Sequence, residues 1–192
     1  MPRLILASTS PYRRELLTRL RLEFETCAPE VTENHVVGES PAGRALRLAR
    51  EKASSVARRL TDAVVIGSDQ VAALDDTVLD KPGSATRCHE QLASVSGRTV
   101  RFLTACVVLG GEGAAQLAHV DTTTVVFRTL ERTEIERYVA VDQPLDCAGS
   151  FKAEALGITL IERIESGDPT ALIGLPLIWL AAALRATGFP LP

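Results

Sequence analysis

The start of the chain pairs a short apolar run with a helix start signal, and this pair constrains the fold more than any other feature of the sequence. Residues 3–7 (RLILA) are typical of a buried strand that ends in a polar loop. Ser10 is a favourable N-cap, and Pro11 suits the first helical position because the N–H that it lacks has no partner there. The leucines that follow form the apolar stripe of a helix to about Leu20. A strand followed at once by a helix predicts an α/β fold.

The same alternation of strand and helix patterns continues along the chain. Ser40-Pro41 repeats the helix start signal, and apolar residues recur at helical spacing to about Leu60. Further helices are expected to end near Val95 and to cover residues 131–141 and 174–186. Strands are expected over residues 63–67, 71–74, 99–109, 116–127 and 158–164, with residues 68–70 at a strand end or bend and residues 110–113 as a hairpin loop.

The length and charge of the chain narrow the classes of protein to which it can belong. A chain of 192 residues can form one hydrophobic core of ordinary size, and because no repeat or linker interrupts it, residues 1–192 are expected to form a single domain. The formal net charge of -3 argues against a protein that coats a nucleic-acid polymer, since such proteins usually carry a basic excess. The longest apolar stretch, residues 171–184, is shorter than the ~20 residues that a bilayer requires. Neither a nucleic-acid polymer nor a membrane is therefore an expected partner.

Cysteine spacing and the order of residues at the start of the chain indicate the compartment. The four cysteines stand at positions 27, 88, 106 and 147, and they form no CxxC pair and no spacing typical of a disulfide framework or a zinc site. They are expected to be reduced thiols. The first apolar run is short and is followed by basic residues, an order unlike that of a signal peptide. The expected location is the cytoplasm.

Two arginines stand where helix electrostatics disfavours them. Arg13 and Arg14 occupy the first turn of the expected first helix, where each cation costs ~0.3–1 kcal/mol against the macrodipole unless an anion is near. Together with the hydroxyls of Ser8 and Ser10 on the same loop, they resemble a phosphate cradle. The alternative is a solvated basic turn without a function.

Other charged residues are ambiguous when they are considered one at a time. Asp69 follows an apolar strand pattern, so it is either a turn former that bonds its own backbone or a site acid at a strand end. Lys52 borders the apolar stripe of the second helix, from which a lysine often merely extends to solvent. Four further charges stand in expected loops, where charged side chains are usually solvated: Glu33, Lys81, Lys152 and Glu154.

Common nucleotide-binding and hydrolase motifs do not account for these residues. The sequence contains no zincin, Walker A, dinucleotide-binding or GxSxG pattern. Taken in order, however, a set of short stretches resembles the Maf family of nucleotide pyrophosphatases along nearly the whole chain. The matching stretches are Leu6-Ala7-Ser8-Thr9-Ser10-Pro11 with Arg13-Arg14, Glu33, Ala49-Arg50-Glu51-Lys52-Ala53, Gly67-Ser68-Asp69, Lys81-Pro82, Ala148-Gly149-Ser150-Phe151-Lys152 and Gly174-Leu175-Pro176-Leu177.

The resemblance implies both a fold and a reaction. Maf-like proteins have an α/β fold in which an extended mixed β-sheet is flanked by helices and two lobes surround a cleft, similar to the inosine-triphosphate pyrophosphatases. They hydrolyse the bond between the α and β phosphates of a nucleoside triphosphate with the help of Mg²⁺ or Mn²⁺. The resemblance therefore implies a small-molecule nucleotide as substrate and a divalent metal cation as cofactor.

The resemblance also implies roles for the charged residues. Asp69 is expected to be the catalytic base or the metal-held activator of the attacking water, and Glu33 is expected to help Asp69 to hold the metal. The residues expected to bind the phosphates are Ser8, Ser10, Arg13, Arg14, Lys52, Lys81 and Lys152.

Three positions bear on which nucleotide is hydrolysed. The aromatic ring of Tyr12 could stack on a base beside the cradle, and the positive charge of 7-methylguanine would add a cation–π contribution of roughly 0.5–2 kcal/mol. The carboxylate of Glu154 could accept both donors on the Watson–Crick edge of guanine. Tyr12, Gln70 and Glu154 together resemble the 7-methyl-GTP branch of the family. The alternative is that Tyr12 packs on the helix start and Glu154 is a surface acid.

Two other functions are compatible with the sequence. One is the same hydrolysis of dTTP, UTP or another non-canonical nucleotide, and the dTTP/UTP branch of the family carries Arg, Lys and Gln at the three specificity positions. The other is a nucleotide-binding regulator of septum formation or cell division. The apolar helix expected over Leu175–Leu184 could also provide a homodimer face.

Overall fold

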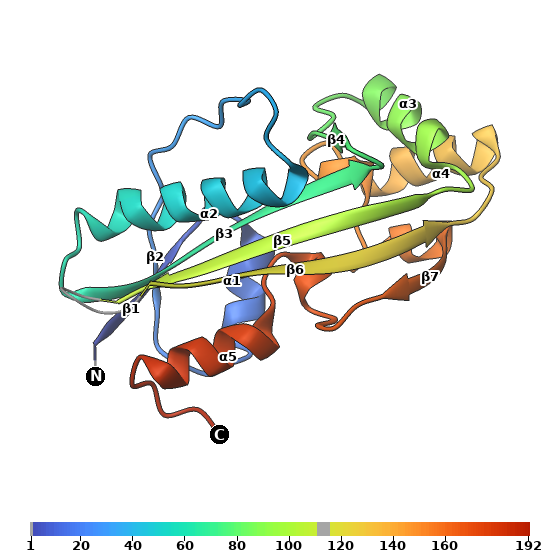
Figure 1. The fold of residues 1–192 in the computed structure, drawn as a ribbon. Helices are drawn as coiled ribbons and strands as arrows, with labels where there is room; N and C mark the ends of the chain where they lie inside the picture. The colour runs from blue at the N-terminus through green and yellow to red at the C-terminus, as the bar shows by residue number, and fades with distance from the viewer. Residues whose placement is uncertain (1, 111–115) are drawn as a thin grey trace. The chain divides into compact units, whose positions relative to one another are not determined.

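The computed structural model describes residues 2–110 and 116–192, in which strands and helices alternate (Figure 1). Apart from Gly110, the hairpin loop expected at residues 110–113 lies outside the described residues. The α-helices are α1 (Pro11–Thr18), α2 (Pro41–Ala57), α3 (Ala85–Val95), α4 (Arg132–Asp142) and α5 (Leu177–Ala186). The strands are β1 (Arg3–Ala7), β2 (Glu25–Thr26), β3 (Ala63–Leu74), β4 (Thr77–Leu79), β5 (Thr99–Leu109), β6 (Gln116–Phe127) and β7 (Ile161–Glu165). The predicted α/β class is confirmed.

The described strands form one seven-stranded mixed sheet in the order β2-β1-β3-β5-β6-β7, with β4 added beside β3. Strand β1 is parallel to both β2 and β3, whereas β4 and β7 pair with their neighbours in the antiparallel sense. Ala7 at the end of β1 lies opposite Gly67 of β3. Because the two strands are parallel, the residues that follow Ala7 and those that follow Gly67 lie at the carboxyl end of β1. Sites are commonly built at the carboxyl ends of strands in α/β proteins.

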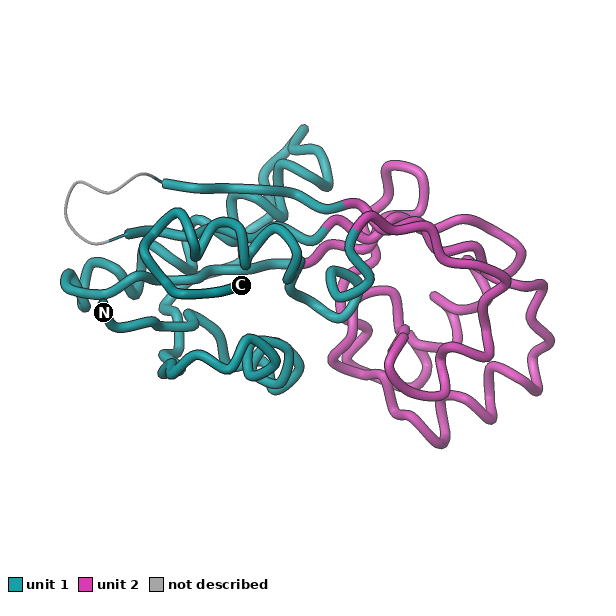
Figure 2. Tube along the Cα trace, turned by 90° about the horizontal axis from the view of Figure 1, so that it is seen from below, with its two compact units in different colours: residues 1–69, 104–121, 168–192 teal, residues 70–103, 122–167 magenta. Residues whose placement is uncertain are grey.

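The chain divides into two compact units (Figure 2). Unit 1 comprises Met1–Asp69, Thr104–Asp121 and Asp168–Pro192, and unit 2 comprises Gln70–Leu103 and Thr122–Gly167. Strand β3 begins in unit 1 and continues into unit 2 after Asp69, and the unit boundaries also fall within β5 and β6. The residues that the sequence predicts for the site therefore belong partly to unit 1 and partly to unit 2.

The core of unit 1 explains why its elements form where they do. Leu16 and Leu17 of α1 are buried against apolar residues of β1 and β3, as the leucine stripe of the sequence predicted. Helix α5 adds Leu180 and Leu184, which are fully buried in the same cluster. Each such side chain contributes roughly 1.5–3 kcal/mol of burial free energy. Much of the apolar surface of α5 is therefore used inside its own unit, and the dimer face expected there stays a prediction.

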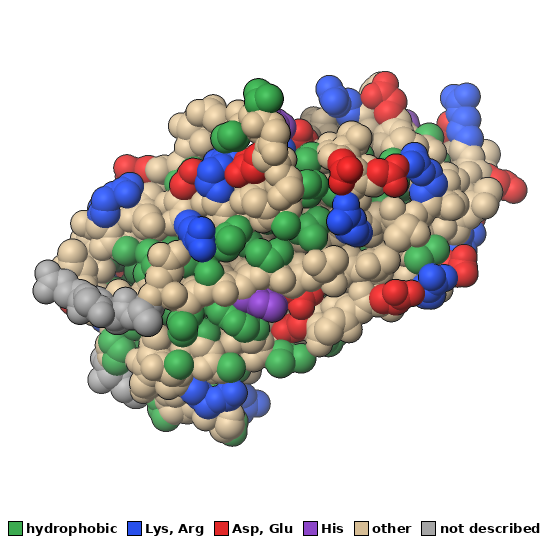
Figure 3. All heavy atoms as spheres, viewed as in Figure 1, with side chains coloured by type: hydrophobic (Ala, Val, Ile, Leu, Met, Phe, Trp, Pro, Cys, Tyr) green, Lys and Arg blue, Asp and Glu red, His purple; other side chains and the backbone are tan. Residues whose placement is uncertain are grey.

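The surface and the helix lengths bear on the expected partners. The face of the molecule in Figure 3 carries acidic, basic and apolar side chains next to one another. Within the residues that the structure describes, no helix is both long enough and apolar enough to cross a membrane.

The structure corrects three details of the expected secondary structure. Residues 68–70 do not form a bend, because β3 runs without interruption from Ala63 to Leu74. Their polar character suggested a break, but Ser68 and Asp69 are buried within the strand and find polar partners there. The strand expected from residue 158 begins only at Ile161, because residues 156–160 form a 3₁₀ turn. The very short strands β2 and β4 were not predicted, since they offer too few residues for a recognisable pattern.

Candidate active site

A close approach of helix α2 to strand β3 places the charged residues of unit 1 (Figure 1). Ser40 caps α2 by accepting a hydrogen bond from the N–H of Gly43 at 3.1 Å, and Pro41 begins the helix, as predicted. Where α2 crosses β3, a β-carbon on Gly67 would lie only 2.7 Å from the β-carbon of Ala53. Only glycine fits this contact, so the backbone of α2 lies directly against the strand that carries Asp69.

Lys52 of α2 joins the two carboxylates that were expected to hold a metal. Its Nζ lies 2.6 Å from Oδ1 of Asp69 and 2.6 Å from Oε1 of Glu33. The side chains of Lys52 and Asp69 retain only 12% and 10% of their exposed surface, whereas Glu33 retains 47%. Lys52 therefore does not extend to solvent, and Asp69 is neither in a turn nor bonded only to its own backbone. The three residues form one partly buried charge cluster.

The loop between β1 and α1 has the predicted cap and a second hydroxyl contact. Oγ of Ser10 accepts a hydrogen bond from the backbone N–H of Arg13 at 3.4 Å, and Oγ of Ser8 accepts one from the N–H of Ser10 at 3.1 Å. Both hydroxyl oxygens thus act as acceptors for the backbone. Each hydroxyl still has its own proton, which it can donate to a phosphate oxygen.

The guanidinium of Arg13 is held from one side by the backbone of Gly174. Nε of Arg13 donates to the carbonyl oxygen of Gly174 at 3.1 Å, and the buried hydroxyl of Ser68 donates to the same oxygen at 2.9 Å. Gly174 has a φ of 134°, which L side chains rarely adopt, and a β-carbon there would lie 3.3 Å from Cγ of Arg13. With Nε engaged, the described residues make no hydrogen bond to the two terminal nitrogens of Arg13, which are the fork that grips a phosphate.

The electrostatic surroundings of Arg13 link it to the charge cluster. Burial lowers the pKa of the Arg13 guanidinium, while the nearby carboxylates of Asp69 and Glu33 act in the opposite direction. By exposed area the residue is only partly buried, and a guanidinium keeps its charge in either environment. Arg13, Lys52, Asp69 and Glu33 therefore form one electrostatically coupled group in unit 1.

A buried aspartate that the sequence analysis overlooked fixes the segment around Gly174. Oδ1 of Asp168 accepts hydrogen bonds from the N–H and the hydroxyl of Thr170, and Oδ2 accepts one from the N–H of Ile178 at the start of α5. The carbonyl oxygen of Leu175 also lies 2.8 Å from Oγ1 of Thr170, so the one hydroxyl proton is shared between this oxygen and Oδ1 of Asp168. The sequence does contain a local pattern that could have indicated this role of Asp168: an aspartate two residues before a threonine, close to the start of a helix. By contrast, no local pattern indicates that Ser68 and Arg13 donate to the same carbonyl oxygen of Gly174.

The two lysines predicted to bind phosphate in unit 2, Lys81 and Lys152, follow two loop segments that Gln91 connects. Oγ of Ser150 donates to Oε1 of Gln91 at 2.6 Å, and Nε2 of Gln91 donates to the carbonyl oxygen of Asp80 at 2.8 Å. These contacts tie the loop before Lys81 to the segment before Lys152. Ser150 has a positive φ of 57°, a conformation that is uncommon outside glycine and is often found at functional sites.

Lys152 is partly committed to unit 2 itself. Its backbone N–H donates to the hydroxyl of Tyr138 at 3.0 Å, and its Nζ donates to the carbonyl oxygen of Asp142 at 2.9 Å. Burial raises the pKa of Tyr138 well above its usual value, so its phenol remains protonated. Lys81 is exposed on the loop that follows β4.

The structure distributes the predicted site residues as follows. Arg14 is exposed, and it makes no ion pair among residues 2–110 and 116–192. Of the three specificity residues, Tyr12 is partly buried at the start of α1, Gln70 is partly buried at the beginning of unit 2, and Glu154 is exposed in unit 2. The residues that unit 1 brings together are therefore Arg13, Glu33, Lys52 and Asp69.

The charge cluster supplies oxygen donors of the kind that a divalent cation takes. In the described part of the chain, no group of three or more His, Cys, Asp or Glu side chains is placed to hold a metal ion. Mg²⁺, however, is usually held by one or two carboxylates, with waters and substrate phosphates completing its shell. Glu33 and Asp69 supply two carboxylates that already converge on one positive nitrogen. They fit the expected metal.

The chain is similar to named proteins along its whole length. A protein of Xanthomonas campestris pv. campestris named "7-methyl-GTP pyrophosphatase" is 57% identical over 100% of both chains. A protein of the same name from Xanthomonas oryzae pv. oryzae is 58% identical over 100% of both chains. Another, from Cupriavidus pinatubonensis, is 52% identical over 99% of this chain and 96% of the relative. Among solved structures, the Ham1 protein of Staphylococcus aureus matches with a TM-score of 0.48 and 15% identity, over 66% of this chain and 72% of that one. The family model described as "Maf-like protein" matches residues 3–187, and the chain belongs to the Maf family.

Proposed function

We propose that this protein is a nucleoside triphosphate pyrophosphatase that hydrolyses the bond between the α and β phosphates of 7-methyl-GTP, giving 7-methyl-GMP and pyrophosphate. The full-length relatives named for this activity support the substrate. The observation that carries the reaction is the convergence of the Asp69 and Glu33 carboxylates on Nζ of Lys52. Acids that can activate water and cations that can offset phosphate charge are both present in this one group.

Asp69 is the proposed base. The oxygen of a water attacks the α-phosphorus, and its proton passes to the carboxylate of Asp69. The bond between the α-phosphorus and the bridging oxygen breaks, and pyrophosphate leaves with the bonding electrons. The ion pair with Lys52 fixes the orientation of the Asp69 carboxylate, since its Oδ1 is held at 2.6 Å.

The cations of unit 1 bind and orient the phosphates. The terminal nitrogens of Arg13 can bind two phosphate oxygens at once, because the carbonyl of Gly174 holds only its Nε. Lys52 offsets the charge that develops on the leaving group. We assign Ser8, Ser10 and Arg14 of unit 1 to the same phosphates, and phosphate binding by Lys81 and Lys152 of unit 2 stays a prediction from the resemblance. A divalent cation, Mg²⁺ or Mn²⁺, would be held by Glu33 and Asp69 and would neutralise phosphate charge and acidify the attacking water.

The guanine ring of the substrate is recognised by an aromatic side chain and a carboxylate. Tyr12 stands beside Arg13 at the start of α1, where its ring can stack on the cationic 7-methylguanine. Gln70 and Glu154 complete the specificity set, with Glu154 accepting hydrogen bonds from the guanine edge. Because all four cysteines are free thiols, we also infer a reducing compartment, the cytoplasm.

The experiment that tests this function is the Asp69→Asn variant in a pyrophosphate-release assay on 7-methyl-GTP. Turnover is expected to fall by about 10²–10⁴-fold, since the amide cannot accept the proton of water. Asp62→Asn is the matched control, because Asp62 is an exposed aspartate whose side chain is 70% exposed in a surface ion pair. Turnover near the wild-type rate in a folded Asp69→Asn variant would refute the assignment. A parallel panel of GTP, dTTP and UTP separates the 7-methyl-GTP activity from the alternative substrates.

A further inference from the structure

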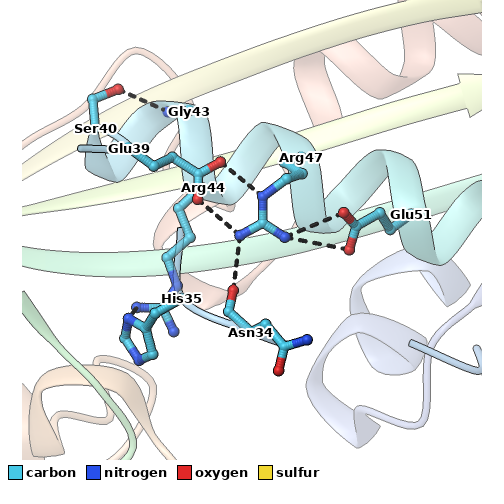
Figure 4. Close-up of polar contacts among 8 residues, drawn as sticks. All are labelled: Asn34, His35, Glu39, Ser40, Gly43, Arg44, Arg47 and Glu51. Atoms are coloured by element: carbon cyan, nitrogen blue, oxygen red, sulfur yellow. Dashed lines mark hydrogen bonds and ion pairs between the residues drawn. The ribbon is translucent and has the colours of Figure 1, made fainter. Parts of the chain in front are cut away.

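Arg47 of α2 holds residues 34–39, the segment that follows Glu33 in the chain (Figure 4). Its Nε and one terminal nitrogen donate to the two carboxylate oxygens of Glu39, both at 2.8 Å. The same terminal nitrogen donates to the backbone carbonyl oxygen of Asn34 at 3.1 Å, and the other donates to Glu51, one turn further along α2, at 3.2 Å. One guanidinium thus binds both ends of residues 34–39 and fixes itself to the helix.

The tip of this segment is exposed to solvent. Val37 is fully exposed and Val36 is 53% exposed, so the apolar side chains at the tip contribute little burial. A terminal nitrogen of Arg44 lies 3.2 Å from Nδ1 of His35, which is a second polar contact to α2 (Figure 4). The hydrogen bonds from Arg47 lower the pKa of Glu39, so this carboxylate stays ionised in the neutral range and the pair is charge-assisted.

The contact with Asn34 bears directly on the charge cluster. Asn34 follows Glu33 in the chain, and Glu33 reaches back to Lys52, which lies on the same helix as Arg47. A backbone tether at residue 34 therefore limits where the Glu33 carboxylate can lie relative to α2. The exposed Glu33 side chain has no comparable restraint from burial, since 47% of it is exposed.

We propose that Arg47 is a positioning residue that holds the Glu33 carboxylate at the cation side of the active site. The proposal rests on the metal role assigned to Glu33 above. Lysine could not replace this arginine, because the planar guanidinium donates to a carboxylate and a carbonyl at fixed angles and an ammonium does not. Loss of the tether should weaken metal binding and leave the chemistry at saturating metal intact.

Arg59 provides a matched control, because it holds the stretch of chain that precedes Glu33. Its guanidinium donates to the carbonyl oxygen of Ala28 at 2.8 Å and to Glu30 at 2.7 Å, and its Nε donates to the carbonyl oxygen of Ser55 at 3.2 Å. Arg59 therefore also ties the loop to the region of α2, but at residues that come before Glu33 in the chain and are not adjacent to it. A general effect of loosening the loop should appear equally when Arg59 is replaced.

The first measurement is amide hydrogen exchange in the metal-free protein. Arg47→Gln and Arg47→Lys should speed exchange in residues 33–38 by about tenfold, with exchange in the rest of α2 unchanged. Arg59→Gln should leave exchange in residues 33–38 within about twofold, because surface ion pairs contribute little. Unchanged exchange in residues 33–38 of both Arg47 variants would overturn the proposal.

The second measurement is the Mg²⁺ concentration that gives half-maximal pyrophosphate release. Arg47→Gln should raise it roughly tenfold with turnover at saturating Mg²⁺ little changed, as expected when a residue that orients a ligand is lost. Equal effects of Arg47→Gln and Arg59→Gln would overturn the proposal in favour of a general loop effect. Glu33→Gln separates the metal role of Glu33 from the tether by Arg47. If this variant leaves the Mg²⁺ requirement unchanged, the metal role of Glu33 is wrong. The exchange data alone then decide whether Arg47 holds the segment.

Discussion

Gly67 of β3 meets Ala53 of α2 so closely that a β-carbon on the glycine would lie 2.7 Å from the β-carbon of the alanine. Real β-carbons do not approach each other to this distance, so the contact requires glycine. Its consequence is functional, because Lys52 precedes Ala53 on the helix and Asp69 follows Gly67 by two residues on the strand. The close crossing is what allows Nζ of Lys52 to reach the Asp69 carboxylate.

Gly67→Ala is expected to destabilise the protein and to disturb the charge cluster. The added methyl group must push α2 away from β3, and such overpacking typically costs about 1–3 kcal/mol of unfolding free energy. The displaced helix carries Lys52 away from Asp69, so turnover should fall in molecules that remain folded. Thermal unfolding and pyrophosphate release measure the two effects. An unchanged melting temperature would show that the crossing is looser than the described contact.

Lys52→Gln is expected to reduce turnover far more than removal of a neighbouring cation. Without Lys52 the Asp69 and Glu33 carboxylates lose their shared counter-charge, and the phosphates lose a cation, so turnover should fall by about 10²-fold or more. Arg50→Gln is the control, because Arg50 is an exposed cation on the same helix. Similar losses in both variants would mean that only the general positive charge of α2 matters.

Gly174→Ala is expected to lower kcat/KM through Arg13. A β-carbon at this position is strained by the φ of 134° and lies 3.3 Å from Cγ of Arg13, so it should move the guanidinium from the carbonyl that orients it. Gly188→Ala is the matched control, because Gly188 also has a positive φ, of 93°, but a β-carbon placed there would have nothing within 4 Å. Both variants should lose stability of about 1–3 kcal/mol from backbone strain, and only Gly174→Ala should weaken phosphate binding.

The stability of the protein should fall as the pH rises above 9, in part because of Cys106. Burial raises the pKa of this thiol to about 12 from its ordinary value of 9.0. Between these values the unfolded chain loses the proton while the folded protein keeps it, so the stability that is present below pH 9 is lost with increasing pH. Each such group contributes a slope of about 1.4 kcal/mol per pH unit. Denaturant unfolding of wild type and Cys106→Ala at pH 8 and pH 10 measures the difference, and equal slopes would contradict the assignment.

The sequence predicted those elements whose signals are local. The boundaries of β1, β5 and β6 agree with the structure because each is an uninterrupted β-rich run, and α1 and α2 begin where a serine cap and a proline place them. The break expected at residues 68–70 was wrong, because the partners that make Ser68 and Asp69 acceptable inside a strand are distant in the chain. The roles of Gly174 and Arg47 were not predictable for the same reason. Each depends on a contact with a backbone carbonyl or a distant side chain that residue type alone does not reveal.

Tyr12→Ala is expected to discriminate between a methylated and a plain guanine nucleotide. If the tyrosine ring stacks on 7-methylguanine, its removal loses a cation–π contribution of roughly 0.5–2 kcal/mol that neutral guanine never makes, so KM should rise about 2- to 30-fold more for 7-methyl-GTP than for GTP. Tyr12→Phe keeps the ring and should preserve most of the preference, which separates stacking from any hydrogen bond of the hydroxyl. Equal increases in KM for both nucleotides would show that Tyr12 acts through the packing of α1, and the preference for the methylated base would then have to come from Gln70 or Glu154.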